Sequence, residues 1–364
     1  TSSPNYRTAR VRFLNALANR QLGVYVTSAS GFRRMVPAAA DVKQAQLELT
    51  VGEEYDPQEL IRQLTQLGYQ RVEQVEKKSE FAVRGSIVDI FPLNQDVPVR
   101  VDFFDVEVDS LRTFDQNNQR SIENITQTKI LPATDLIVTE EQFSQGIEKL
   151  QKQVQAARKR LDEDDQEALQ QNIAEVTDRW RKHQIIPEDV IYTKQLYAKP
   201  NSLLDYLADG VLVVDDYPRI LDAELDIQKN EASWIVDQLK NNVLLDNDPF
   251  GLEIRQLIRQ KKQSQVFLSM FQKGMGRLKF DQLTEITTRA VQEFFGQMPV
   301  LKGEVERWMS RHATVLIFTN SKERQSKIAS TLHDFEIASQ TVQADRVIIG
   351  AVNIIGQSFS QGFE

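Results

Sequence analysis

Arg84, Arg100 and Phe104 are side chains whose types suit the binding of an acidic protein surface. An arginine guanidinium carries planar donors that pair bidentately with a carboxylate. A neighbouring phenylalanine excludes water from such a pair, as in many interface hot spots. Taken singly, each residue is better explained as a surface arginine or a scattered exposed phenylalanine. A shared face would favour the binding interpretation.

The stretches 80–92 and 98–109 should position these residues. Each alternates apolar and polar side chains, is rich in Val, Ile and Phe, and is bounded by turn residues, which predicts a β-hairpin. The alternation turns one set of side chains inward: Phe81, Val83, Val99, Val101 and Phe103. Arg84, Arg100 and Phe104 then share the outward face, and Gly85 is suited to a bulge or a close backbone approach. Alanine at Arg84 or Arg100 should barely change stability, because surface substitutions usually cost within about 0.5 kcal/mol.

Asp215 and Asp216 form a second candidate site, at the end of an apolar run. This is the pattern of a Walker B strand, whose first acid helps to hold magnesium and whose second positions the attacking water. No Gly-x-x-x-x-Gly-Lys-Ser/Thr phosphate-binding motif occurs in the sequence. An ordinary parallel strand followed by an acidic turn explains the same residues.

The composition argues against several classes of function. A net charge of −8 does not favour non-specific duplex binding, which depends on clustered Lys and Arg. With zero cysteines and three scattered histidines, the sequence predicts no metal site. We expect a cytoplasmic protein, since no apolar run reaches the roughly 20 residues of a membrane helix and no signal peptide opens the chain.

Several elements can be predicted from capping and periodicity. A helix over 8–22 should precede a strand over 24–27, and Asp56 with Pro57 should start a helix that ends at Gly68. Helical spacing between 140 and 183 predicts two antiparallel helices. Near the end of the chain we expect a strand over 313–319, a helix over 322–332 capped by Ser321, and a strand over 346–352.

Residues 47–132 resemble the domain with which bacterial transcription-repair coupling factors, and their relative UvrB, contact the damage-recognition ATPase UvrA. The resemblance lies in a series of motifs in the same order: Val51-Gly-Glu53, Gly68-Tyr-Gln-Arg-Val72, Glu80-Phe-Ala-Val-Arg-Gly85, Asp89-Ile-Phe-Pro92, Arg100-Val-Asp-Phe-Phe104, Glu107 to Asp115 and Gln119-Arg-Ser121. Weaker similarity to the coupling factors extends over nearly the whole chain.

The resemblance implies an α/β multidomain fold and a piece of a longer protein. Residues 1–46 would end the first part of a degenerate RecA-like domain of the P-loop type, and residues 47–135 would form an inserted α+β UvrA-binding domain. Residues 136–285 would complete the RecA-like domain with a helical insertion, and residues 286–364 would form a small α/β domain. UvrB-like helicases carry Asp-Glu-Ser-His where this chain has Asp215-Asp216-Tyr217-Pro218. This departure implies a vestigial Walker B site.

Carried over by position, the UvrA-contacting residues of the family fall on Arg84, Arg100 and Phe104. The resemblance therefore implies a non-catalytic module that recruits UvrA in transcription-coupled nucleotide excision repair, with no cofactor of its own. The full-length parent would use ATP and magnesium in a DNA translocase motor and would bind RNA polymerase and double-stranded DNA through further domains. No membrane partner is expected. Two alternatives stay open: a catalytically competent UvrB-like helicase domain, and a clamp that holds the motor inactive.

Overall fold

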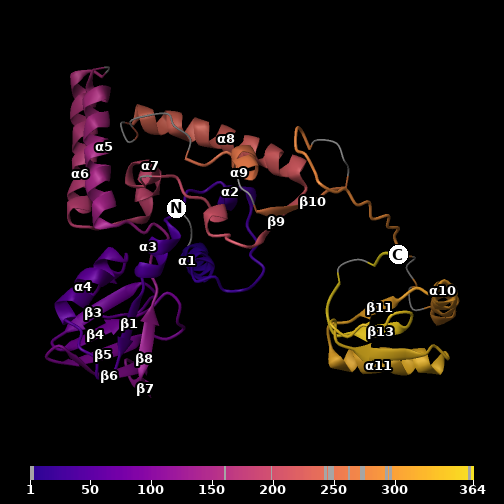
Figure 1. Cartoon of the computed structure of the whole chain (residues 1–364). Coiled ribbons are helices and arrows are strands. Elements are labelled where there is room, and N and C mark those ends of the chain that lie inside the picture. The colour runs from indigo at the N-terminus through magenta and orange to yellow at the C-terminus, as the bar shows by residue number, and fades with distance from the viewer. Residues whose placement is uncertain are drawn as a thin grey trace. The chain divides into compact units, whose positions relative to one another are not determined.

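The computed structural model describes residues 4–159, 161–197, 199–241, 244, 250–260, 263–270, 275–291, 294, 297–359 and 362–364. The chain forms two compact units, Thr1–Arg277 and Leu278–Glu364. Helices and several separate sheets make it a mixed α/β protein (Figure 1). The expected α/β class is confirmed at this level.

A six-stranded sheet dominates the first half of the first unit. Its strands are β2 (Gln70–Arg71), β3 (Glu80–Arg84), β4 (Ile87–Ile90), β5 (Val99–Phe104), β6 (Glu107–Phe114) and β7 (Ser121–Ile125). They lie side by side in chain order. Strands β3 to β7 are antiparallel to one another, and only β2 pairs in parallel, with β3. The sheet is therefore a meander extended by one short parallel strand.

The expected hairpin is wrong in its connectivity, because each of its two halves is itself a hairpin. Arg84 pairs with Ile87 across Gly85 and Ser86, and Phe104 pairs with Glu107 across Asp105 and Val106. Gly85 and Asp105 have φ of 63° and 57°. Two-residue hairpin turns favour such left-handed backbone, which Gly and Asp adopt readily. Gly85 is thus a turn residue and not a bulge.

The main core lies between the inner face of this sheet and α4 (Pro57–Gln66) (Figure 1). Asp56 caps α4 by accepting from the Gln58 N–H, Pro57 occupies its first turn, and Gly68 follows with φ 83°, as predicted. Leu60 and Leu64 are completely buried against the sheet. The antiparallel pair β1 (Leu47–Thr50) and β8 (Gln127–Ile130) closes the same core.

Three helices precede this region: α1 (Pro4–Ala18), α2 (Ala29–Phe32) and α3 (Ala39–Gln44). The strand predicted over 24–27 is wrong. These residues have no regular secondary structure, and no strand in the described part of the chain pairs with their backbone. A strand needs a hydrogen-bonded neighbour, so β-propensity alone does not make one. Val24 and Val26 are consequently exposed.

The two antiparallel helices predicted between 140 and 183 are confirmed as α5 (Glu140–Arg158) and α6 (Glu163–Arg181), which pack along each other (Figure 1). Thr139 and Asp162 cap them. The rest of the first unit contains the short helices η1 (Pro187–Tyr192), α7 (Thr193–Leu196) and η2 (Leu203–Asp205), then β9 (Val211–Asp215), α8 (Tyr217–Lys240), α9 (Ile254–Gln260) and β10 (Ser264–Leu268). Strands β9 and β10 form a parallel pair.

The second unit is a small α/β layer. It consists of α10 (Met298–Ser310), β11 (Val315–Phe318), α11 (Lys322–Asp334), β12 (Ser339–Val342) and β13 (Val352–Ile355), with β13 central in a parallel sheet. Ser321 caps α11 as predicted. The strand expected over 346–352 is wrong, because the chain turns at Gly350 (φ 72°) and the next apolar run pairs instead. The β12 strand was not anticipated.

Candidate protein-interaction site

The outer face is the side of the six-stranded sheet that carries Ala82, Arg84, Asp89, Arg100 and Phe104. Register places Ala82, Asp89, Arg100 and Arg112 opposite one another in one row across β3, β4, β5 and β6. Arg84 and Phe104 are the last residues of β3 and β5, next to turns at the same end of the sheet. The structure therefore brings the three predicted site residues to one face.

Arg100 is held by an ion pair within the domain. Its Nε and Nη2 donate to the two carboxylate oxygens of Asp89 at 2.7 and 2.9 Å. The Asp89 side chain is 1% exposed and that of Arg100 is 17% exposed. The hydrogen bonds that Arg100 donates to Asp89, partly offset by burial, raise the pKa of Arg100 above its usual value. Arg100 is thus a fixed cation and not a free surface arginine.

The guanidinium of Arg100 also lies over an aromatic ring. Its central carbon is 4.7 Å from the ring centroid of Phe114, which is completely buried. Such a cation–π contact adds to the ion pair. Phe114 belongs to a small apolar cluster that packs on the outer side of the sheet, with Val75, Ala82 and Phe91. The outer face is therefore partly covered, and Arg100 lies at the edge of this cluster.

Arg84 and Phe104 are much less constrained. Arg84 is exposed, and its Nη2 donates to the Glu73 carbonyl at 2.9 Å. Phe104 is 76% exposed, which is costly for a residue with a large aromatic group. Beside them, Asp102 accepts from Ser86 Oγ at 3.1 Å and from Arg112 Nη2 at 3.3 Å. The face thus offers an exposed cation, an exposed aromatic ring and one immobilised arginine.

Asp215 and Asp216 lie at the carboxyl end of β9, as expected of a parallel strand. Asp215 is exposed. Asp216 has φ 58° and serves as the N-cap of α8, where its Oδ1 accepts from the Arg219 N–H at 3.4 Å. A carboxylate that caps its own helix is poorly placed to position water on a nucleotide. Asp215 alone also makes a poor magnesium site, because such sites combine carboxylates with substrate phosphates.

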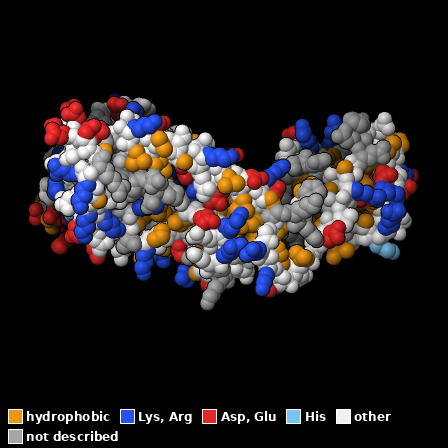
Figure 2. Space-filling model, turned by 90° about the horizontal axis from the view of Figure 1, so that it is seen from above, with side chains coloured by type: hydrophobic (Ala, Val, Ile, Leu, Met, Phe, Trp, Pro, Cys, Tyr) orange, Lys and Arg blue, Asp and Glu red, His pale blue; other side chains and the backbone are white. Residues whose placement is uncertain are grey.

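Other chemistry is sparse in the described part of the chain. That part holds no group of three or more His, Asp or Glu side chains arranged to bind a metal ion. Its helices include none with the length and apolar character needed to cross a bilayer. In Figure 2, Lys and Arg side chains on the visible face are interspersed with acidic and uncharged ones and form no continuous stripe. The visible face therefore offers no continuous basic track of the kind that follows a phosphate backbone.

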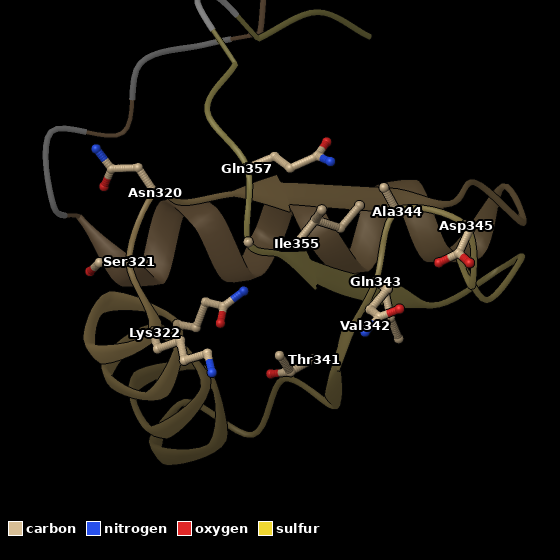
Figure 3. Close-up of a pocket in the computed structure, with 12 residues that line it drawn as sticks. Asn320, Ser321, Lys322, Thr341, Val342, Gln343, Ala344, Asp345, Ile355 and Gln357 are labelled. Carbon is tan, nitrogen blue, oxygen red and sulfur yellow. The ribbon is translucent and has the colours of Figure 1, made fainter. Parts of the chain in front are cut away.

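The second unit contains a cavity of about 750 Å³. It lies where β11, β12 and β13 end, beside the first turn of α11, and Figure 3 shows Lys322 and Thr341 on either side of it. Open α/β sheets bind ligands at this edge. Its lining holds one lysine and one aspartate, Asp345, among neutral groups. Those groups do not define a particular ligand chemistry.

Residues 47–136 match the model of the UvrB interaction domain family. Over its full length the chain is also 34% identical to the transcription-repair-coupling factor of Bacillus subtilis. The proteins of the same name from Staphylococcus haemolyticus and Staphylococcus aureus are each 28% identical to it over the full chain. The predicted resemblance to transcription-repair coupling factors is confirmed.

The chain spans 31% of the length of each of these coupling factors. The match to the UvrB interaction domain covers the six-stranded sheet, α4 and the β1–β8 pair. All three predicted site residues, Arg84, Arg100 and Phe104, lie inside it. Asp215, Asp216 and the second unit lie outside it.

Sequence reasoning missed Asp89, Glu73 and Phe114, which contact the predicted arginines. A signal for Asp89 is present in the alternation: Phe81 and Val83 are inward at odd positions, whereas Val88 and Ile90 are inward at even positions. This shift requires a turn at Gly85 and Ser86, and it places Asp89 opposite Arg100. The contact of Glu73 is made by its backbone, so its side-chain type carries no signal.

Proposed function

We propose that this chain is a docking module for UvrA that takes part in transcription-coupled nucleotide excision repair. The observation that carries the proposal is the shared outer face of Arg84, Arg100 and Phe104 within the segment that matches the UvrB interaction domain family. A surface of this kind fits a partner with carboxylates for the guanidinium groups and an apolar pocket for the phenyl ring.

We also propose that β9, β10 and their neighbouring helices belong to a degenerate RecA-like domain. The parallel pairing of β9 and β10 and the acids at the end of β9 support this. The capping role of Asp216 argues against a working nucleotide site and hence against the alternative of a UvrB-like helicase. In a longer parent protein, ATP-driven translocation and the binding of RNA polymerase and DNA would then belong to other domains.

The clamp alternative is compatible with docking. One face cannot contact a motor domain and UvrA at once, but it can contact the motor domain while UvrA is absent and UvrA afterwards. The exposed ring of Phe104 supports both, since either partner would remove it from water. Direct binding to UvrA is the outcome that separates docking from a purely inhibitory role.

Calorimetric titration of the chain with purified UvrA tests the proposal. Alanine at Arg84 or Phe104 should each weaken binding by about 2 kcal/mol, or about 30-fold in Kd, because truncating a desolvated anchor leaves its partner groups unpaired. Arg62→Ala is the matched control, since Arg62 is an exposed arginine of α4, the helix on the opposite side of the sheet. The proposal fails if the parent chain does not bind UvrA, or if Arg84→Ala and Phe104→Ala both bind as tightly as the parent.

A further inference from the structure

Asp89 is the buried acid of the outer face. It lies on β4 directly opposite Arg100 on β5, and both of its oxygens accept from the guanidinium. A buried carboxylate with one partner is expensive to keep, because its desolvation is only partly repaid by the ion pair. Replacing such a pair with apolar residues often costs nothing in stability, so stability alone does not account for this pair.

The pair fixes the orientation of Arg100. Asp89 holds Nε and Nη2, and the central carbon of the guanidinium lies over the Phe114 ring, 4.7 Å from its centroid. The Nη1 group has no partner among the described residues and keeps both of its N–H donors for another molecule. A long side chain fixed in this way loses little rotamer freedom on binding. Arg84, with one hydrogen bond to a carbonyl, lacks this constraint.

The pair also changes the electrostatics of the face. Asp89 neutralises the charge of Arg100, so of the two predicted arginines only Arg84 keeps a charge that is not balanced by a paired carboxylate. Arg100 would then select a partner carboxylate by the geometry of its hydrogen bonds more than by long-range attraction. Removing the charge of Asp89 would make the face more positive and, on charge alone, more attractive to an acidic partner.

We propose that Asp89 is a positioning residue of the interface, which holds the Arg100 guanidinium so that Nη1 donates to a carboxylate of the partner. This inference rests on the proposed docking function. It predicts that Asp89→Asn weakens UvrA binding by about tenfold, the loss expected when one rotamer-rich side chain must be ordered on binding. If only the charge of the face mattered, Asp89→Asn would instead strengthen UvrA binding.

The experiment titrates UvrA with the parent chain, Asp89→Asn, Arg100→Gln and the double variant, each first shown by its melting curve to be folded at the titration temperature. Tyr69→Phe is the control for a merely structural role, because it removes a buried hydrogen bond to the Leu131 carbonyl in the same domain without touching Arg100. We expect Tyr69→Phe to bind like the parent. In the Arg100→Gln background, Asp89→Asn should weaken binding no further, since its effect passes through Arg100.

The inference is overturned if Asp89→Asn binds UvrA with parental or greater affinity. It is also overturned if Asp89→Asn weakens UvrA binding as much in the Arg100→Gln background as in the parent. If Asp89→Asn does not fold, Asp89→Glu replaces it as the test, because it keeps the negative charge but moves the carboxylate oxygens away from Nε and Nη2. Weaker binding by Asp89→Glu then supports the inference, and unchanged binding overturns it. The docking function itself fails separately, if the parent does not bind or if Arg84→Ala and Phe104→Ala bind like the parent.

Discussion

Phe103 and Phe104 are neighbours in the chain but lie on opposite faces of one strand, and the two residues are 5% and 76% exposed. Phe103 packs in the core under α4, whereas Phe104 ends β5 on the outer face. Because side chains alternate between the two faces of a strand, we expect Phe103 to affect stability and Phe104 to affect binding.

Alanine substitution of these two residues should therefore give opposite phenotypes. Phe103→Ala should lower the free energy of unfolding by about 3–5 kcal/mol, because it leaves a cavity in the core. Phe104→Ala should change it by no more than about 0.5 kcal/mol while weakening UvrA binding. Urea denaturation of both variants measures the free energy of unfolding. Equal losses of stability would contradict the assignment of the two faces.

The ion pair of Arg100 reverses the expectation that its substitution leaves stability unchanged. Arg100→Ala strands Asp89, which is 1% exposed, and should cost about 3–5 kcal/mol. Arg84→Ala, at an exposed site, should stay within about 0.5 kcal/mol. Denaturation midpoints of the two variants provide the comparison. The double change Asp89→Val with Arg100→Leu should restore much of the loss, and failure to do so would mean that the pair stabilises more than its burial suggests.

Asp135 should make stability depend on pH in the acid range. Burial raises the pKa of its carboxyl, but the hydrogen bond from Arg10 and the charges of Arg34 and Arg10 outweigh this and lower the pKa overall. A lowered pKa in the folded state gives stability that is present above the unfolded value of about 3.9 and is lost as pH falls through the folded value.

Asp135→Asn should therefore be less stable than the parent at pH 7, and the difference should shrink as pH falls below about 4. Urea midpoints at several pH values measure it. Asp109→Asn, at an exposed carboxylate, is the control and should follow the parent throughout. A constant difference between Asp135→Asn and the parent would show that the carboxyl stabilises the fold by packing and not by charge.

We expect no ATP hydrolysis by this chain, with or without DNA. Asp216 caps α8, and the sequence holds no phosphate-binding motif to place a nucleotide beside Asp215. Phosphate release at saturating ATP and magnesium is the measurement. Turnover that disappears on Asp215→Ala would show a working site and would favour the helicase alternative.

Local signals predicted the elements that depend on a few neighbouring residues. The Asp56 cap, the Gly68 stop and the Ser321 cap each satisfy backbone groups within one turn, so a short stretch of sequence determines them. The division of β5 into two faces likewise follows from alternation alone. The strand predicted over 24–27 depends on a partner distant in the chain: these residues have a strand pattern, but no strand among the described residues pairs with them.

The candidate site was predicted in its outline but not in its contacts. Alternation placed Arg84, Arg100 and Phe104 on one face, but it could not show that Arg100 is bound, because the pairing of β4 with β5 depends on a turn that was read as part of one strand. Predicting Asp89 requires the register, and predicting Phe114 requires the next strand as well. The predicted domain boundaries and the role of Asp215 stay predictions.

The chain-order pairing of β3 to β7 bears on when the outer face can form. Asp89 and Arg100 are 11 residues apart, as are Glu73 and Arg84, so the contacts that shape the face are short-range in sequence. Contacts of this kind close quickly, whereas long-range pairings are slow. Domains also tend to fold in turn from the amino terminus during synthesis. We therefore expect the docking surface to be complete on the ribosome-bound polypeptide before the second unit has been made.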